Sequence, residues 1–306
     1  MITVIIPLYN KKSSIARALD SVLSQTYQDF EVIVVDDGST DEGAAIVEQY
    51  TDPRIRLVRQ ENLGVSAARN RGIKEAKGDY VAFLDADDEW MTEFLEEIVA
   101  LQNEFPQCRA HATNYKFCRE GIFFKSVIRR ITFTETHGML TNYFDVAAHS
   151  HPPITSNSIS VERQLLLEIG GFPRGVTSGE DLLTWARIAT QTSISYSHKV
   201  LAIYNLGEGY DKRNLPARRN DKKDVVGDGL LEILYDSPST KGLKKYLSHW
   251  HKMRASVAVR YGERKETIYE SKQALKYNPF NFSVMLFVVL AILPASIRKF
   301  IICKFN

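Results

Sequence analysis

Residues 30–41 (FEVIVVDDGSTD) join an apolar run to a cluster of acidic and small polar residues. Residues 30–35 are rich in β-branched side chains, which is typical of a buried strand, and the run stops at Asp36 and Asp37. Residues 80–88 (YVAFLDADD) repeat the pattern. Two apolar strands that each end in carboxylates predict a sheet with an acidic edge.

Helical patterns separate these strands from their neighbours. An apolar run at residues 3–8 and an alternating pattern at residues 55–59 predict two further strands. Helices are expected from about residue 13, from about residue 41 and over residues 64–77. This alternation predicts right-handed βαβ units in an α/β fold with a mostly parallel sheet flanked by helices. Such sheets bind ligands beyond the carboxyl ends of their strands, where both acidic clusters fall.

The C-terminal third is helical in pattern. Helices are predicted over residues 224–235, 243–261 and 263–277, after a charged linker at residues 212–223. We therefore divide the chain into an α/β domain, residues 1–220, and a helical extension, residues 221–306.

Charge is distributed unevenly along the 306 residues. The composition, 44% hydrophobic and 25% charged, is that of a globular protein, and a net charge of +2 gives no basic field for nucleic acid. Residues 241–306, however, hold 13 Lys or Arg against 3 Asp or Glu. Three cysteines without metal-ligand spacing and an N-terminus without a secretion signal favour a cytoplasmic protein.

The last residues predict a membrane contact. Residues 284–293 are ten consecutive apolar residues that end at Pro294, whereas a membrane-spanning helix needs about 20. With the basic residues beyond it, the segment 281–306 is interpreted as a basic amphipathic tail on the anionic inner face of the cell membrane. The alternative is a buried C-terminal helix.

The acidic clusters indicate metal chemistry. Asp85 and Asp87 are two residues apart, so on an extended segment both carboxylates face the same way. Hard oxygen ligands of this kind suit Mn²⁺ or Mg²⁺, which would clamp a diphosphate. The alternative is that these residues only shape loops and helix starts, and Asp88 is expected to cap the next helix.

Six motifs, in order over roughly the first 190 residues, resemble those of family 2 glycosyltransferases with the GT-A fold. They are VIIPLYN at residues 4–10, VVDDGSTD at 34–41, NLGVSAARN at 62–70, FLDADD at 83–88, GGF at 170–172 and GEDLLTW at 179–185. The basic, apolar tail resembles that of bacterial surface-polysaccharide transferases.

The resemblance implies a role for each motif. The segment Pro7, Leu8 and Tyr9 would line the pocket of the nucleotide base, and Asp37 would accept a hydrogen bond from uracil. Asp85 would bind ribose or a metal-bound water, and Asp87 would coordinate the metal. Arg69 would either neutralise phosphate or lie on the surface. The stretch after Tyr204 lacks a histidine that many relatives have as a metal contact.

The pair Glu180 and Asp181 carries the expected catalytic step. Asp181 is expected to act as the general base that takes the proton of an acceptor hydroxyl, with Glu180 as the rival; the alternative is that both only favour a helix N-terminus. Trp90 and Trp185 are candidates for stacking on a sugar or for the core. His149, His151 and His198 are weaker candidates for assisting the metal or the acceptor.

We therefore expect an inverting, metal-dependent transferase that moves a hexose-type sugar from a UDP-sugar to a hydroxyl. The acceptor would be a lipid-linked oligosaccharide for capsule, exopolysaccharide or O-antigen. One alternative is a nucleotidyltransferase, which would usually carry a glycine-rich phosphate loop that residues 7–12 (PLYNKK) lack. The other is a non-catalytic nucleotide-sugar-binding protein, which predicts the loss of a base or metal ligand; Asp85, Asp87 and Asp181 are all present.

Overall fold

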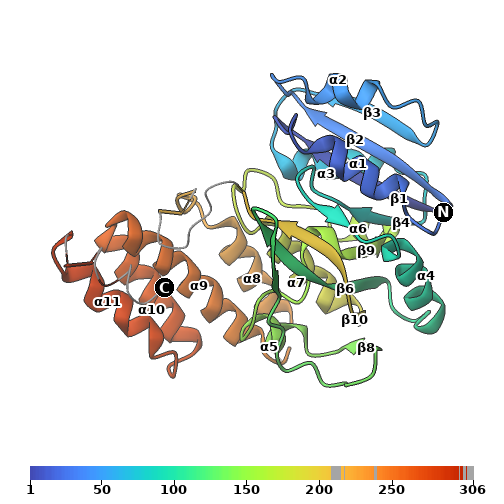
Figure 1. The fold of residues 1–306 in the computed structure, drawn as a ribbon. Coiled ribbons are helices and arrows are strands. Elements are labelled where there is room, and N and C mark those ends of the chain that lie inside the picture. The colour runs from blue at the N-terminus through green and yellow to red at the C-terminus, as the bar shows by residue number, and fades with distance from the viewer. Residues whose placement is uncertain (208–214, 217, 238–239, 296, 299–300, 302–306) are drawn as a thin grey trace.

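The computed structural model describes residues 1–207, 215–216, 218–237, 240–295, 297–298 and 301 (Figure 1). One large sheet, covered by helices on both faces, forms the body of the molecule, and the C-terminal helices lie beside it. The order of the strands along the sheet is β3-β2-β1-β4-β9-β6-β10-β5, with β7 paired to β6 and β8 paired to β10.

The first half of the sheet is parallel, as the sequence predicts. Its strands are β1 (Ile2–Leu8), β2 (Phe30–Asp37), β3 (Ile55–Gln60) and β4 (Tyr80–Phe83). Every residue of β1 is buried, since it lies between β2 and β4 and is covered on both faces. An apolar run without alternation is what such a central strand requires.

The second half of the sheet is mixed. Strand β9 (Ile159–Glu162) runs antiparallel to both β4 and β6 (Ala110–Arg119), whereas β10 (Ile194–Asn205) is parallel to β6. Three short strands complete it as antiparallel partners: β5 (Glu89–Trp90), β7 (Ile122–Lys125) and β8 (His137–Leu140). The predicted α/β fold is thus confirmed, with parallel pairing concentrated in the N-terminal half.

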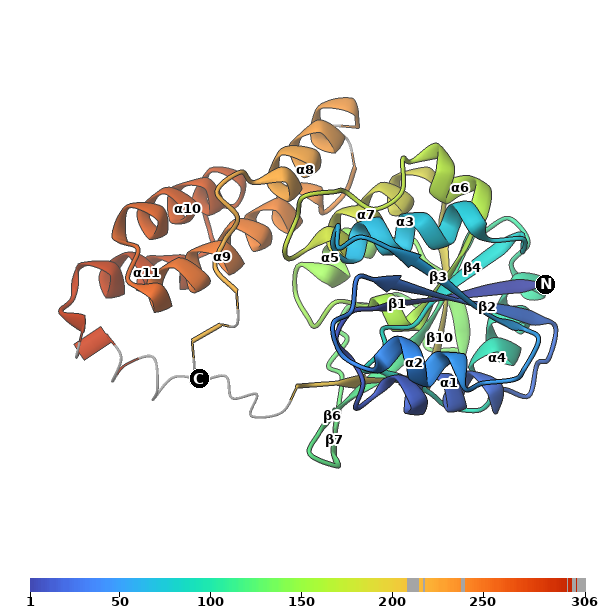
Figure 2. The ribbon, with the colours of Figure 1, turned by 90° about the horizontal axis from the view of Figure 1, so that it is seen from above.

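Helices cover the two faces of the sheet (Figure 2). One face carries α3 (Val65–Glu75), α6 (Arg163–Glu168) and α7 (Glu180–Gln191), and the other carries α1 (Ile15–Leu23), α2 (Gly43–Glu48) and α4 (Phe94–Glu104). The alternating side chains of β1 divide accordingly: Ile5 packs in the core under α3, and Val4 and Ile6 pack in the core under α1. Gly72 permits the close contact of α3, because a Cβ there would lie 2.5 Å from Ile5.

The C-terminal helices continue the core of the α/β body. They are α8 (Val225–Asp236), α9 (Leu243–Tyr261), α10 (Arg264–Tyr277) and α11 (Ser283–Ile292). Leu230 of α8 and Trp250 of α9 belong to the same apolar cluster as Phe83 of β4 and Leu183 of α7. The short helix α5 (Tyr143–Ala147) packs against α9. A domain boundary at residue 220 stays a prediction, and one core extends across it.

The tail differs from the prediction in one respect. Val284, Leu290 and Ala291 of α11 are buried, while Met285 and Leu286 are about half exposed, so the helix is apolar on both faces and not amphipathic. The basic residues come after Pro294, and two of them, Lys299 and Lys304, lie outside the described residues. Among the helices that the structure describes, none combines the length and apolar character needed to cross a membrane.

Candidate functional site

A cavity of about 880 Å³ lies beyond the carboxyl ends of β1, β2 and β4. We call it the strand-end cavity. The structure brings to it eight of the nine site residues that the sequence predicts: Pro7, Leu8, Tyr9, Asp37, Arg69, Asp85, Asp87 and Glu180. Most of them lie at or just after the ends of β1, β2 and β4, because parallel strands end at the same edge of a sheet, whereas Arg69 comes from α3 and Glu180 from the start of α7.

Asp37 is buried at the end of β2 and holds the neighbouring loop. One carboxylate oxygen accepts hydrogen bonds from Gln60 Nε2 at 2.6 Å and from the Leu63 amide at 3.0 Å, and the other accepts from the Gly64 amide at 2.8 Å. These bonds fix the loop that leads into α3. Asp36 shapes the adjacent turn by accepting a hydrogen bond from the Ser39 amide.

Arg69 joins two predicted carboxylates inside the protein. Its guanidinium donates to Asp85 at 2.7 Å and to Glu180 at 3.1 Å, and its side chain is 3% exposed. The surface position that we considered for Arg69 is therefore wrong, because the side of α3 that carries Arg69 packs against the sheet. Burial by itself lowers the pKa of Arg69, but Asp85 and Glu180 outweigh it and raise the pKa above its usual value.

Asp87 lies at the cavity wall and pairs with Lys11. The Lys11 ammonium is 2.5 Å from one carboxylate oxygen, and both side chains are more than a third exposed. Arg69 likewise bonds one oxygen of Asp85. The second oxygen of each carboxylate has no hydrogen-bond partner among the described residues, so this pair fits a hard divalent cation.

Asp88 does not cap a helix, contrary to the prediction. The residue at the start of α4 is Glu93, whereas Asp88 is buried and accepts hydrogen bonds from Asn157 Nδ2 and the Asn205 amide, both at 2.7 Å. Burial, then Asp85 and Asp87, raise the pKa of Asp88 well above its usual value. It fastens the acidic loop to the end of β10.

Asp181 lies in a second cavity of about 690 Å³, which we call the Asp181 cavity. Tyr115, Phe117, Thr155 and Trp250 are among the residues that line it. Burial raises the pKa of Asp181 to about 7, the Glu180 carboxylate adds to the rise, and Arg69 opposes it. A carboxylate with that pKa is suited to exchanging protons near neutral pH.

The comparisons with known proteins agree with this geometry. Residues 3–150 match the family model described as glycosyl transferase family 2. The chain belongs to the family 2 glycosyltransferases. A protein of Rickettsia felis described as an uncharacterized glycosyltransferase is 32% identical over 68% of this chain and 33% of its own length. The amylovoran biosynthesis glycosyltransferase AmsB of Erwinia amylovora is 47% identical over 32% of this chain and 35% of its own.

A solved structure shows the fold of this glycosyltransferase over nearly its whole length. S. aureus TarS, residues 1–349, in complex with UDP-GlcNAc, superposes with a TM-score of 0.70 over 99% of this chain and 89% of that one, at 21% identity. At that identity the likeness establishes the fold. The alignments with the curated relatives named above cover about a third of the length of each of those proteins.

The two tryptophans considered for sugar stacking belong to the core of the glycosyltransferase. Trp90 is 4% exposed and stacks on Phe94, with ring centroids 4.2 Å apart. Trp185 is fully buried against Phe83 and Phe172, beneath the site. Among the histidines, His149 and His151 line a third cavity, and His198 packs beside Phe133.

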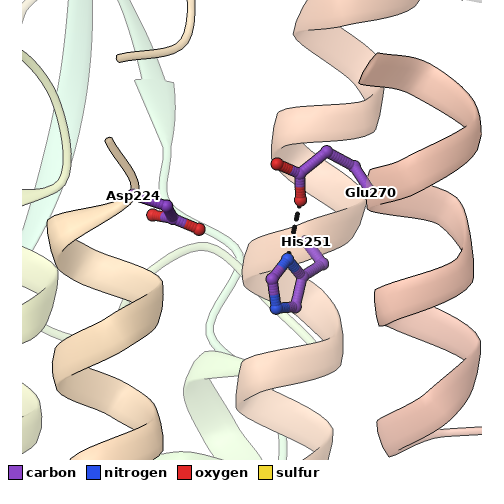
Figure 3. Close-up of side chains that lie close together, drawn as sticks. All are labelled: Asp224, His251 and Glu270. Carbon is purple, nitrogen blue, oxygen red and sulfur yellow. Dashed lines mark hydrogen bonds and ion pairs between the residues drawn. The ribbon is translucent and has the colours of Figure 1, made fainter. Parts of the chain in front are cut away.

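A second group of metal-ligand types lies among the C-terminal helices of the glycosyltransferase. Asp224, His251 and Glu270 bring possible ligand atoms within 4.8 Å of one another (Figure 3). Arg254 already supplies a cation there, with Nε 2.6 Å from Glu270 and 3.4 Å from Asp224. We therefore interpret the group as a buried ion pair that joins α8, α9 and α10.

Several residues of the site were not predicted from the sequence. Lys11, Tyr204 and Trp250 line the cavities of the glycosyltransferase, and they come from a loop, the end of β10 and α9. Lys11 could have been found, because it follows β1 directly at the edge where ligands bind. Tyr204 and Trp250 carry no such signal, since their position depends on how the second half of the chain packs.

Proposed function

We propose that this chain transfers a hexose-type sugar from a UDP-sugar to a hydroxyl group of a lipid-linked glycan, with inversion at the anomeric carbon. One observation carries the proposal: the consecutive residues Glu180 and Asp181 line two adjoining cavities, whose walls share Val176, Tyr204 and residues 218–221. Glu180 lines the strand-end cavity and Asp181 lines the Asp181 cavity. This arrangement suits a transferase that inverts the anomeric carbon, because donor and acceptor would then approach the reacting carbon from opposite sides.

The strand-end cavity would hold the donor. Pro7, Leu8 and Tyr9 would contact the uracil ring, and Asp37 would accept a hydrogen bond from the ring N–H. Asp85 would bind the ribose, while Arg69, held between Asp85 and Glu180, keeps a positive charge near the diphosphate. Arg69 would also position the carboxylates of Asp85 and Glu180.

Asp181 would act as the general base. Its carboxylate removes the proton of the acceptor hydroxyl as the oxygen attacks the anomeric carbon from the side opposite the diphosphate, and the diphosphate leaves with the bonding electron pair. A positioned base of this kind contributes about 10²–10⁴-fold to the rate. The Leu182 amide, 2.8 Å from one Asp181 oxygen, orients the carboxylate.

Asp87 and Asp85 would hold Mn²⁺ or Mg²⁺. When bound, the divalent cation stabilises the negative charge of the leaving diphosphate. Lys11 would have to exchange its partner at that moment, because its ammonium is paired with Asp87 in this structure.

The acceptor and the membrane are inferred from the tail and from AmsB. AmsB is named for amylovoran biosynthesis, which supports a role in capsule, exopolysaccharide or O-antigen assembly. The exposed apolar side chains of α11, with the net positive charge of residues 241–306, support peripheral binding at the inner face of the cell membrane.

Thermal unfolding with UDP, GDP and CMP, each with and without Mn²⁺, tests the proposal. A ligand at 100 times its Kd stabilises the folded state by about 2.7 kcal/mol, which would raise Tm by a few degrees. We expect a shift with UDP that requires Mn²⁺, followed by transfer from a UDP-sugar. A preference for GDP would overturn the donor, and binding without any turnover would favour a non-catalytic protein.

A further inference from the structure

A third cavity, of about 580 Å³, lies between the α/β body and the C-terminal helices. Its wall comes from the segment after β7, the residues after α5, one side of α9 and the turn between α10 and α11. We call it the basic cavity, because its lining includes Arg129, His149, His151, Lys245, His249 and Lys252. No acidic residue is among the described residues that line it.

The basic groups of this cavity are only partly neutralised. Asp145, nearby, is 3.6 Å from His149 and 3.7 Å from Lys245, and it also pairs with Arg130. Within the described part of the chain, the side chains of Arg129, His249 and Lys252 have neither a hydrogen bond nor an ion pair. Arg129 and Lys252, the two cations of this group, are in position to bind an anion.

Hydrogen bonding and burial determine the state of two histidines in this cavity, His151 and His249. The Val127 amide donates to His151 Nδ1 at 2.9 Å, which leaves the proton of the neutral ring on Nε2. Burial, and then Lys252 and His149, lower the pKa of His249 to about 4. Burial is the main cause, so the His249 ring is neutral at neutral pH, and the cations that a phosphate would meet are Lys252 and Arg129.

The basic cavity is a neighbour of the Asp181 cavity. His151 lines the basic cavity, and the next residue, Pro152, lines the Asp181 cavity. On α9, Lys252 lines the basic cavity and Met253 lines the Asp181 cavity. The His151 ring also packs edge-on against Phe117 of the Asp181 cavity, with centroids 5.2 Å apart. The two cavities therefore lie on opposite sides of a shared wall.

Exposed apolar residues border the basic cavity on two sides. Phe280, in the turn before α11, lines it and is 79% exposed, and Val127, which also lines it, follows the exposed strand β7 with Ile122 and Phe123. A phosphate carried on an apolar chain has the chemistry that this combination would recognise: cations for the phosphate and apolar side chains for the lipid.

We propose that the basic cavity binds the phosphate group of the lipid-linked acceptor and so holds the acceptor sugar toward Asp181. This inference rests on the proposed function and specifies how the acceptor is held. The phosphate would accept hydrogen bonds from Lys252 and Arg129, and the glycan would extend past residues 151–152 into the Asp181 cavity.

The test is binding to three kinds of vesicle: phosphatidylcholine alone, phosphatidylcholine with a polyprenyl phosphate, and phosphatidylcholine with phosphatidylglycerol at matched surface charge. Inorganic pyrophosphate is titrated separately by calorimetry. The Lys252→Gln/Arg129→Gln variant is compared with Lys244→Gln/Lys265→Gln, which removes the same charge from exposed positions outside the cavity. Lys252→Arg, which keeps the charge, controls for loss of folding.

We expect the native chain, the control and Lys252→Arg to prefer polyprenyl phosphate vesicles, and the cavity variant to lose about tenfold or more of that binding, as the loss of charge-assisted hydrogen bonds predicts. Three outcomes would overturn the proposal. Equal binding to both anionic vesicles would assign the cavity to bulk lipid headgroups, and binding of pyrophosphate alone would assign it to free phosphate. Unchanged binding by the cavity variant would exclude the cavity as the site.

The UDP and Mn²⁺ shift in Tm is measured on the same variants. If the cavity variant loses lipid binding and keeps the UDP shift, the two sites are separate, as we expect. If the native chain shows no UDP shift but binds polyprenyl phosphate through this cavity, the phosphate site stands and the donor assignment falls.

Discussion

The carboxyl group of Asp181 shows how one residue acquires its chemistry from its surroundings. Burial and the adjacent Glu180 raise its pKa to about 7, so the group is half ionised near neutral pH. Transfer should therefore increase as pH rises through about 7, because only the carboxylate can accept a proton. Asp181→Asn should lower the rate at least ~10²-fold and leave UDP binding intact. Loss of the same magnitude in Glu180→Gln, with Asp181→Asn active, would reverse the two roles.

The same pKa predicts an effect on stability. Between the unfolded value of about 3.9 and the folded value of about 7, the native state holds a proton that the unfolded state has released. The free energy of unfolding attributable to Asp181 therefore falls as pH rises through this range. We expect Asp181→Asn to raise Tm at pH 8 and to change it little at pH 4. An equal change at both pH values would contradict the raised pKa.

Asp87 should be required for metal-dependent donor binding. Asp87→Ala leaves Lys11 without its partner and removes one of the two proposed ligands, so the Mn²⁺-dependent UDP shift in Tm should disappear. Asp228→Ala, at an exposed position of α8, is the matched control and should keep the shift. A full UDP shift in Asp87→Ala would remove this residue from the metal site.

At the scale of elements, the start of α7 decides where the catalytic pair lies. Gly179 has φ +88°, and a Cβ there would lie 2.7 Å from the Trp250 ring, so α9 fixes this turn from outside the α/β body. Gly179→Ala should lower stability by about 1–3 kcal/mol and reduce transfer, since the turn must shift. Gly175→Ala, with φ +72° but no atom within 4 Å, isolates the cost of backbone strain. Equal losses in the two variants would show that the Trp250 contact is unimportant.

At the scale of the whole molecule, the exposed side of α11 can be tested without disturbing the core. Removing residues 281–306 would uncover the surfaces against which Val284 and Leu290 pack. Replacing Met285, Leu286 and Val289 by Gln changes exposed positions only, so anionic vesicle binding should fall several-fold while Tm stays within about 1 °C. Tyr269→Gln, 57% exposed on α10, is the control. Unchanged vesicle binding in the triple variant would remove α11 from the membrane contact.

Local pattern accounts for the parts that the sequence predicted well. The runs at residues 30–35 and 80–84 form β2 and β4, and α9 begins and ends at the predicted residues. These elements could be predicted because burial gives helices and strands different spacings of apolar residues along the sequence. The acidic loops could be placed at one edge because parallel strands share their direction. The motif residues of the strand-end cavity followed from that placement.

Tertiary packing alone decided the rest. The mixed half of the sheet, the burial of Arg69 and the role of Asp88 depend on partners far along the chain; Arg69 and Glu180 are 111 positions apart. The basic cavity likewise combines residues from four separate segments. No local period records such contacts, because they arise only when the helices and strands pack together. The sequence by itself therefore determined the family, the elements and the acidic edge, whereas the tertiary structure decided which charges face one another and which stay without a partner.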